Sequence, residues 1–252
     1  MNSALFPLPH IEDCPKRIRV YTGGVCLIDT KKAKYVWLHP HYPTYFVPQE
    51  ELPMKWYLQH AGETEHEIQY HVLAGLQPNS APSITLYKTG ALAGLAVVKF
   101  DAMEAWFEED EQIFIHPRDP YKRVDIVQSS RHIRVEAGGV EVANSRAPRM
   151  VFETGLPVRY YIPKTDCRMD LWEVSPTKTG CPYKGVASYY NIVLSSGEII
   201  RDVVWWYPTT VVEASALRGF VAFYDEKLDV WIDGEKQERG PIPEIPLYSP
   251  MP

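Results

Sequence analysis

The stretch IRVYTGGVCLIDT, residues Ile18–Thr30, decides the fold, because the chain repeats it as IRVEAGGVEVANS, residues Ile133–Ser145. The two segments stand 115 residues apart and share the start Ile-Arg-Val and a Gly-Gly pair. Runs rich in strand-forming residues on both sides of a Gly-Gly pair are typical of a β-hairpin. Matching segments at a fixed offset predict a structural unit that occurs twice in the chain.

Two further pairs of segments extend the repeat. KYVWLHPHYPTYFVP, which begins at Lys34, aligns with RMVFETGLPVRYYIP, which begins at Arg149, at the same offset of 115. GLAVVKFDAMEAWFEED, from Gly94, aligns with GFVAFYDEKLDVWIDGE, from Gly219, at an offset of 125. Collinear matches with one change of offset predict a tandem duplication in which the second copy carries a net insertion in its middle.

Within each copy the residue pattern is typical of strands. Apolar and polar residues alternate with a period of two, as from Leu228 to Asp233, and SYYNIVL and EIIRDVVWWY flank SSG as in a hairpin. One short helical turn is expected near Val211–Leu217. We therefore predict a mostly β fold, with two tandem antiparallel sheet units that pack about a pseudo-twofold axis.

The repeats set the expected boundaries of the chain's parts. We expect a first β repeat over residues 17–110, a charged connector with prolines over 111–131, and a second β repeat over 132–239. Residues 240–252 form a proline-rich tail that is expected to lie extended on the surface. We place the functional site in the second repeat.

Composition limits the function classes. The formal net charge of −6 and the lack of a basic stripe argue against nucleic-acid binding. The chain has no run of about 18 apolar residues and no basic start before an apolar run, so neither a membrane span nor a leader is expected. None of the four cysteines, Cys14, Cys26, Cys167 and Cys181, stands in a C-x-x-C pair. We expect reduced thiols, no structural zinc and a cytoplasmic protein.

The segment GCPYKG, from Gly180, carries the first candidate chemical groups. Cys181 lies in a turn between glycine and proline, and Lys184 follows three residues later. A nearby ammonium lowers the pKa of a thiol, which suits Cys181 as a nucleophile or proton donor. The alternative is a buried, inert cysteine in a tight turn, and the sequence alone favours this alternative.

The segment ETGLPVRYYIP carries the second set. In its RYY run, Arg159 and Tyr161 are expected on one face of a strand and Tyr160 on the other. A guanidinium beside a phenol suits a bound carboxylate or phosphate, and Glu153 suits a general acid or base, or a salt bridge to Lys184. The alternative is an ion-pair network without chemistry.

The two copies differ at these positions. At the offset of 115, Glu153 corresponds to Leu38 and Arg159 to Thr44, while CPYKG has no counterpart in the first copy. A charge needed only by the fold should be present in both copies. Downstream, one of the adjacent residues Trp205 and Trp206 must face each side of a strand, one in a core and the other in a cavity wall.

These motifs resemble a known family. GGV, ETGLPVRYYIP with Asp166, CPYKG and GFVAFY are similar to the family of domains of unknown function numbered 427, which is also catalogued as nucleotidyltransferase-like, and the chain is similar to its two-copy members. The resemblance implies a small, curved, tent-like antiparallel sheet in each copy. It implies no established reaction.

The candidate site follows from the residues together with the resemblance. Its proposed catalytic residues are Glu153, Lys184 and Cys181. The residues proposed to bind a substrate are Arg159, Tyr160, Tyr161, Asp166, Asp170, Tyr183, Tyr189, Trp206 and Tyr207. No cofactor or metal is predicted, although His39 and His41 on one face of a strand offer a minor metal-binding alternative.

Three functions fit this set. The first is a cofactor-independent lyase, isomerase or hydrolase that acts on a small anionic or carbonyl-bearing molecule. The second is a small-molecule binding module without turnover, and the third is a metal-dependent nucleotidyltransferase. The expected partner is a small molecule, and a homo-oligomer is left open.

Overall fold

The chain folds into two compact units, Met1–Asp119 (unit 1) and Pro120–Pro252 (unit 2). The structure, a computed structural model, describes residues 6–54, 57–73, 81–240 and 249–250. Neighbouring strands run antiparallel, and helices are restricted to short 3-10 turns among the described residues. The predicted mostly β fold with two repeated units is confirmed.

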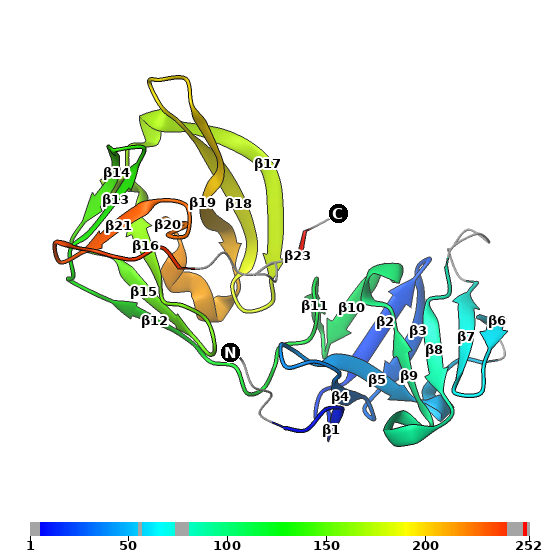
Figure 1. Ribbon diagram of the computed structural model, residues 1–252. Helices are drawn as coiled ribbons and strands as arrows, with labels where there is room; N and C mark the ends of the chain where they lie inside the picture. The colour runs from blue at the N-terminus through cyan, green and yellow to red at the C-terminus, as the bar shows by residue number, and fades with distance from the viewer. Residues whose placement is uncertain (1–5, 55–56, 74–80, 241–248, 251–252) are drawn as a thin grey trace. The chain divides into compact units, whose positions relative to one another are not determined.

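Unit 1 contains two sheets (Figure 1). The seven-stranded sheet has the order β1 (His10–Asp13), β4 (Lys34–Trp37), β5 (Thr44–Pro48), β9 (Leu95–Val98), β8 (Ile84–Tyr87), β7 (Glu67–Val72) and β6 (Leu58–Glu63). The four-stranded sheet has the order β11 (Glu111–Ile113), β10 (Ala105–Glu108), β2 (Ile18–Thr22) and β3 (Val25–Thr30). Short turns η1 (Gln49–Glu51), η2 (Gly90–Leu92) and η3 (Phe100–Ala102) connect strands.

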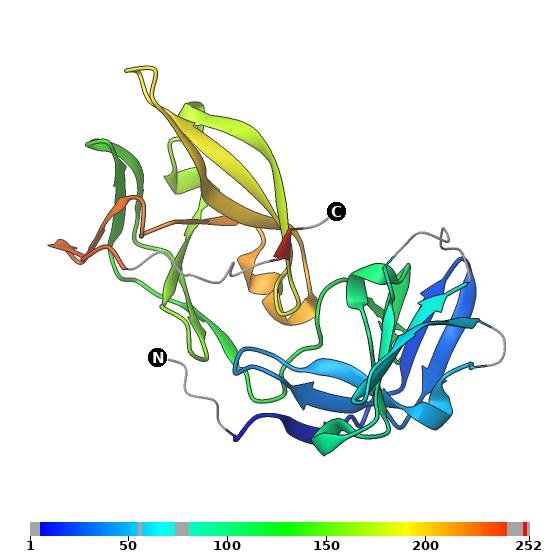
Figure 2. The same ribbon diagram turned by 45° about the vertical axis from the view of Figure 1, so that its right-hand side comes forward.

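Unit 2 repeats this plan with longer strands, and Figures 1 and 2 show β17, β18 and β19 as long curved strands. Its eight-stranded sheet has the order β12 (Val124–Gln128), β15 (Arg149–Glu153), β16 (Arg159–Pro163), β20 (Phe220–Phe223), β19 (Ile199–Thr210), β18 (Gly185–Val193), β17 (Trp172–Cys181) and β23 (Ser249–Pro250). Its four-stranded sheet has the order β14 (Val140–Ser145), β13 (Ile133–Ala137), β21 (Asp229–Ile232) and β22 (Glu235–Lys236). The connecting turns are η4 (Lys164–Asp166), η5 (Met169–Leu171) and η6 (Val212–Leu217), and η6 confirms the expected helical turn.

The strand pairing of the two units shows the same duplication as the sequence. Ile18 pairs with Thr30 in unit 1, Ile133 pairs with Ser145 in unit 2, and a bulge interrupts both hairpins after the third residue of the first strand. Both hairpin turns consist of two glycines with positive φ, which is the turn that a tight two-residue connection requires. The two copies therefore share their pairing and bulges as well as their sequence.

The third sequence match is shifted by one residue against the structure. In unit 1, Trp106 pairs with Val20; in unit 2, Val230 pairs with Val135, the counterpart of Val20. Trp106 therefore occupies the place of Val230, and not that of Trp231 as the alignment implies. The chain between the two sheets is one residue longer in unit 1, and the register of β10 absorbs the difference.

The two faces of the eight-stranded sheet of unit 2 carry different clusters. One face joins the four-stranded sheet in a core that includes Val135, Ile162, Val204 and Val221. We call this the inter-sheet face. The other face, here the outer face, carries a separate cluster of buried residues: Val151, Tyr161, Cys181, Ala187, Tyr189, Trp205, Tyr207, Ala214, Leu217 and Ala222. Alternation along each strand decides which side chains reach which face.

The expected connector and tail also take part in the sheets. Residues 111–131 contribute β11 to unit 1, where it pairs with β10, and β12 to unit 2, where it pairs with β15. In the tail, β23 pairs with β17, while 241–248 and 251–252 lie outside the described residues. None of the helices in the described part of the chain is long and apolar enough to cross a membrane.

Candidate functional site

A buried ion pair lies on the outer face of unit 2. The Nζ of Lys184 donates to Oε1 of Glu153, and the two side chains are 1% and 8% exposed. Glu153 ends β15, and Lys184 stands in the turn between β17 and β18. The pair therefore joins two distant parts of the sheet, and it is the salt bridge expected as one of the alternatives for Glu153.

The turn that presents Lys184 is set by local geometry. The amide of Lys184 donates to the carbonyl of Cys181 over 3.3 Å, which closes a turn over Pro182 and Tyr183. Gly185 follows with a φ of +111°, and a side chain there would collide with the carbonyl oxygen of Thr209 on β19. Gly185 therefore fixes the backbone beside Lys184, because the close approach of β19 leaves no room for a side chain there.

The thiol of Cys181 and the phenol of Tyr161 lie beside this pair. Burial raises the pKa of Cys181, the Lys184 ammonium opposes that rise, and the Glu153 carboxylate adds to it. Burial also raises the pKa of Tyr161 to about 12, with the same two charges acting in opposite directions. The Tyr161 hydroxyl accepts a hydrogen bond of 3.0 Å from Nε1 of Trp205. Four proton-bearing or proton-accepting groups thus meet in one buried cluster.

Arg159 is held by two carboxylates on the same face. Its guanidinium forms ion pairs with Asp225 and Glu226, including a 3.0 Å bond from Nη1 to Oε2 of Glu226. The ring centroid of Trp205 lies 5.6 Å from the guanidinium carbon. The cation predicted to hold an anionic ligand therefore already has two anionic partners from its own chain.

Asp225, Glu226 and Trp205 are absent from the predicted site. A signal for Asp225 exists in the repeat: at the offset of 125 it corresponds to Phe100, just as Arg159 corresponds to Thr44 at the offset of 115. Glu226 corresponds to Asp101, which keeps the negative charge. The cation and one of its acidic partners are absent together in unit 1. A search for charges that disappear in pairs between the copies would have identified the interaction.

The remaining predicted residues divide between the faces as the strand alternation requires. Tyr189 and Tyr207 belong to the outer-face cluster and Tyr183 packs against it. The structure does not bring four of the predicted residues to this cluster. Tyr160 and Trp206 pack on the inter-sheet face. Asp166 accepts a 2.6 Å hydrogen bond from Ser145, and Asp170 pairs with Arg168 in an exposed position. The expectation that Trp205 and Trp206 face opposite sides is confirmed.

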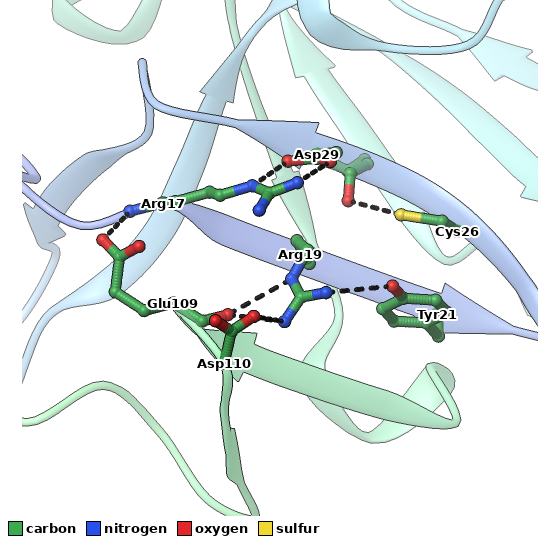
Figure 3. A network of polar contacts seen from close by, with 8 residues as sticks. Arg17, Arg19, Tyr21, Cys26, Asp29, Glu109 and Asp110 are labelled. Carbon is green, nitrogen blue, oxygen red and sulfur yellow. Dashed lines mark hydrogen bonds and ion pairs between the residues drawn. The ribbon is translucent and has the colours of Figure 1, made fainter.

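Unit 1 shows what an ordinary ion-pair network in this fold looks like. Figure 3 shows Arg17, just before β2, and Arg19, on β2, beside the carboxylates of Asp29 and Asp110. The side chains of Arg17 and Asp29 are 37% and 43% exposed, so their pairing is screened by water and contributes little to stability. The Lys184–Glu153 pair differs from this network in its burial.

No group of three or more His, Cys, Asp or Glu side chains arranged to hold a metal ion is found within the described ranges. His39 and His41, the proposed minor metal site, have ring centroids 5.5 Å apart. Tyr42 packs edge-on against His39 with centroids 4.5 Å apart. These side chains form a small aromatic cluster in unit 1.

The fold and the cluster define a class of protein: a duplicated two-sheet β protein in which the outer face of unit 2 carries a buried Lys–Glu pair beside a thiol and a phenol. The profile of the family described as a domain of unknown function (DUF427) matches residues 10–71 and 125–234, more than half of the chain. The chain therefore belongs to this family, with one matched segment in each unit. A comparison with curated proteins gives no match.

Proposed function

We propose that unit 2 is a cofactor-independent enzyme that moves a proton on a small anionic, carbonyl-bearing molecule. Glu153 and Lys184 are the acid–base pair, and the phenol of Tyr161 and the thiol of Cys181 lie beside them. The observation that carries this proposal is the burial of the Lys184–Glu153 pair at 1% and 8% exposure.

The cost of such a pair supports a functional role. Removing two charges from water costs several kcal/mol per ion, and well-packed apolar residues of similar size are often at least as stabilising. Unit 1 has the same sheet plan with Leu38 in place of Glu153 and no counterpart of Lys184. Leu38 is 46% exposed, so unit 1 forms the same sheet without a buried charge at this position, and the buried pair of unit 2 favours chemistry over scaffolding.

The environment of Cys181 favours proton donation over nucleophilic attack. A thiol attacks as its thiolate, and burial raises the pKa of Cys181. The protonated thiol can instead donate a hydrogen bond or a proton to a developing oxyanion. Lyase and isomerase chemistry therefore fit this cluster better than hydrolysis through a thioester intermediate.

The test is deuterium exchange at the carbon next to a carbonyl. The full chain is incubated in D2O with pyruvate, 2-oxobutyrate or acetoacetate, and loss of the α-proton signal is followed by NMR. We expect protein-dependent exchange with at least one probe, and a loss of about a hundredfold or more in Glu153→Gln and Lys184→Met. The exposed residues Glu198 and Lys178 provide matched controls, Glu198→Gln and Lys178→Met, which should exchange at the wild-type rate. Lack of exchange with all three probes, or full exchange in both site variants, contradicts the proposal.

A second function is favoured by one observation: Arg159 and Lys184 already have acidic partners within the chain. A binding module without turnover can use such a pre-ordered, internally neutralised cluster to recognise a ligand that replaces one partner. It predicts saturable binding with the ligand recovered unchanged. Recovery of a deuterated or converted molecule excludes it in favour of the enzyme.

A further inference from the structure

Three aromatic rings form a continuous stack on the inter-sheet face of unit 2. Trp172, Tyr190 and Trp206 lie on the neighbouring strands β17, β18 and β19. The ring centroids of Trp172 and Tyr190 are 5.0 Å apart at 27°, and those of Tyr190 and Trp206 are 6.1 Å apart at 12°. We call these three rings the aromatic platform. All three are half-buried, so the platform retains surface that another ring can cover.

A lysine lies across this platform. The Nζ of Lys164, the first residue of η4, is 3.0 Å from the ring centroid of Trp206 and 3.4 Å from the hydroxyl of Tyr190. No described residue forms an ion pair with Lys164, and burial lowers the pKa of its ammonium. The negative faces of aromatic rings compensate a cation in part, but a half-buried ammonium is stabilised most by an anion.

Unit 1 provides an internal comparison. The shared strand registers place residues without this chemistry at three of the four positions: Gln49 for Lys164, Leu58 for Trp172 and Leu86 for Trp206, with Tyr70 for Tyr190. Leu86 and Tyr70 are buried at 2% and 8% exposure. At three of these four positions unit 1 therefore has no aromatic ring or cation, whereas unit 2 combines three half-buried rings with an ammonium.

We propose that the aromatic platform and Lys164 form a binding site for a planar aromatic molecule that carries a carboxylate or a phosphate. The ring of the ligand stacks on the platform, and its anionic group replaces water at the ammonium of Lys164. This site lies on the face of the sheet opposite to Glu153 and Lys184, so it is independent of the proton-transfer proposal.

Lys164 contacts the anionic group of the ligand, and the aromatic platform contacts its ring. The contributions of the two groups to binding affinity can therefore be measured separately. A charge-assisted contact to Lys164 distinguishes an anion from a neutral molecule of the same shape. Stacking on Trp206 favours the anion and the neutral molecule alike. A ligand with only one of these features is therefore expected to bind more weakly than one with both.

The test is titration calorimetry of the full chain with 1-naphthoate, 1-naphthyl phosphate and the neutral 1-naphthalenemethanol. We expect saturable binding of at least one anion, tighter than that of the alcohol, and the two anions identify the preferred group. Lys164→Gln should weaken the preferred anion by roughly tenfold to a hundredfold and leave the alcohol unchanged. Lys164→Arg should retain most of the affinity, and Trp206→Leu should weaken all three probes.

The exposed Lys31 in unit 1 is the matched control, because Lys31→Gln makes the same change of net charge in the unit that lacks the platform. It should bind the anions as the wild type does. The proposal is overturned if neither anion binds, if the alcohol binds as tightly as the anions, or if Lys164→Gln behaves like Lys31→Gln.

Discussion

Lys184 donates from the turn between β17 and β18 to Glu153 at the end of β15, and the pair lies in a cluster otherwise formed by aromatic and small apolar side chains. An ion pair in such a place is costly to desolvate, and its partners depend on each other once they are buried. This dependence predicts how the protein responds when one or both charges are removed.

Removing one charge should be worse than removing both. Lys184→Met or Glu153→Met leaves an uncompensated buried charge and should lower the free energy of unfolding by about 3 to 5 kcal/mol. The double variant should lose about 1 kcal/mol or less. Urea titration of the four proteins measures the coupling between the two side chains. Additive losses would contradict the interdependence of the pair.

The carboxylates around Arg159 predict a pH dependence. Burial raises the pKa of Asp225 to about 6, with Glu226 adding to the rise and Arg159 opposing it. The folded state therefore favours protonated Asp225, and this stabilisation is lost as the pH rises from about 4 to 6. Relative to the wild type, Asp225→Asn should become more stable by about 1 to 3 kcal/mol between pH 4 and pH 7.

Glu226 provides the opposite control. Although burial opposes it, the hydrogen bond from Arg159 leaves the pKa of Glu226 lowered, so its stabilisation is present at neutral pH and lost as the pH falls. Glu226→Gln should therefore be more costly at pH 7 than at pH 4. Urea titrations at both pH values measure these trends. The same pH trend in both variants would contradict the opposite pKa shifts of Asp225 and Glu226.

The thiols should differ strongly in reactivity. Cys26 is exposed, Cys14 and Cys181 are buried, and burial raises the pKa of the half-buried Cys167 to about 12. At pH 8, Ellman's reagent should label one thiol rapidly and the other three only as the protein opens. Cys26→Ser should remove the rapid phase. A rapid phase that survives this change and disappears in Cys181→Ser would show that Cys181 is an accessible, activated thiol.

The hydrogen bond between Tyr161 and Trp205 is buried at both ends. Tyr161→Phe leaves the indole N–H of Trp205 without this acceptor and should lower the free energy of unfolding by about 1 to 3 kcal/mol. Tyr160→Phe, on the opposite face of the same strand, is the control and should change it by about 0.5 kcal/mol or less. Equal effects from the two changes would contradict the structural role of this bond.

The period-two pattern of the sequence predicted which face of the sheet most of the candidate side chains occupy. It separated Arg159 and Tyr161 from Tyr160, and Trp205 from Trp206, because neighbouring side chains on a strand must point to opposite faces. It could not place Trp106, because a one-residue change in a connection shifts the register of the next strand without changing the pattern. The repeat itself was fully visible in the sequence.

The candidate site was predictable where its parts are local. The turn from Cys181 to Lys184 is encoded by CPYKG, and the contrast with the first copy indicated Glu153. The carboxylates that hold Arg159 come from the chain that follows β20, and only the pairing of β16 with β20 brings them close. Long-range pairing of this kind leaves no local pattern. The comparison of charges between the copies points to Asp225, and only the structure shows that Glu226 also pairs with Arg159.

The most direct test of the central claim, that the Lys184–Glu153 pair serves chemistry and not the fold, is α-proton exchange by the double variant Glu153→Met/Lys184→Met. Its free energy of unfolding and its rate of deuterium incorporation into the wild-type protein's best probe are measured on the same preparation. We predict a folded protein with near wild-type stability and an exchange rate reduced to that of buffer. A folded double variant that exchanges the proton as fast as the wild type would contradict the claim.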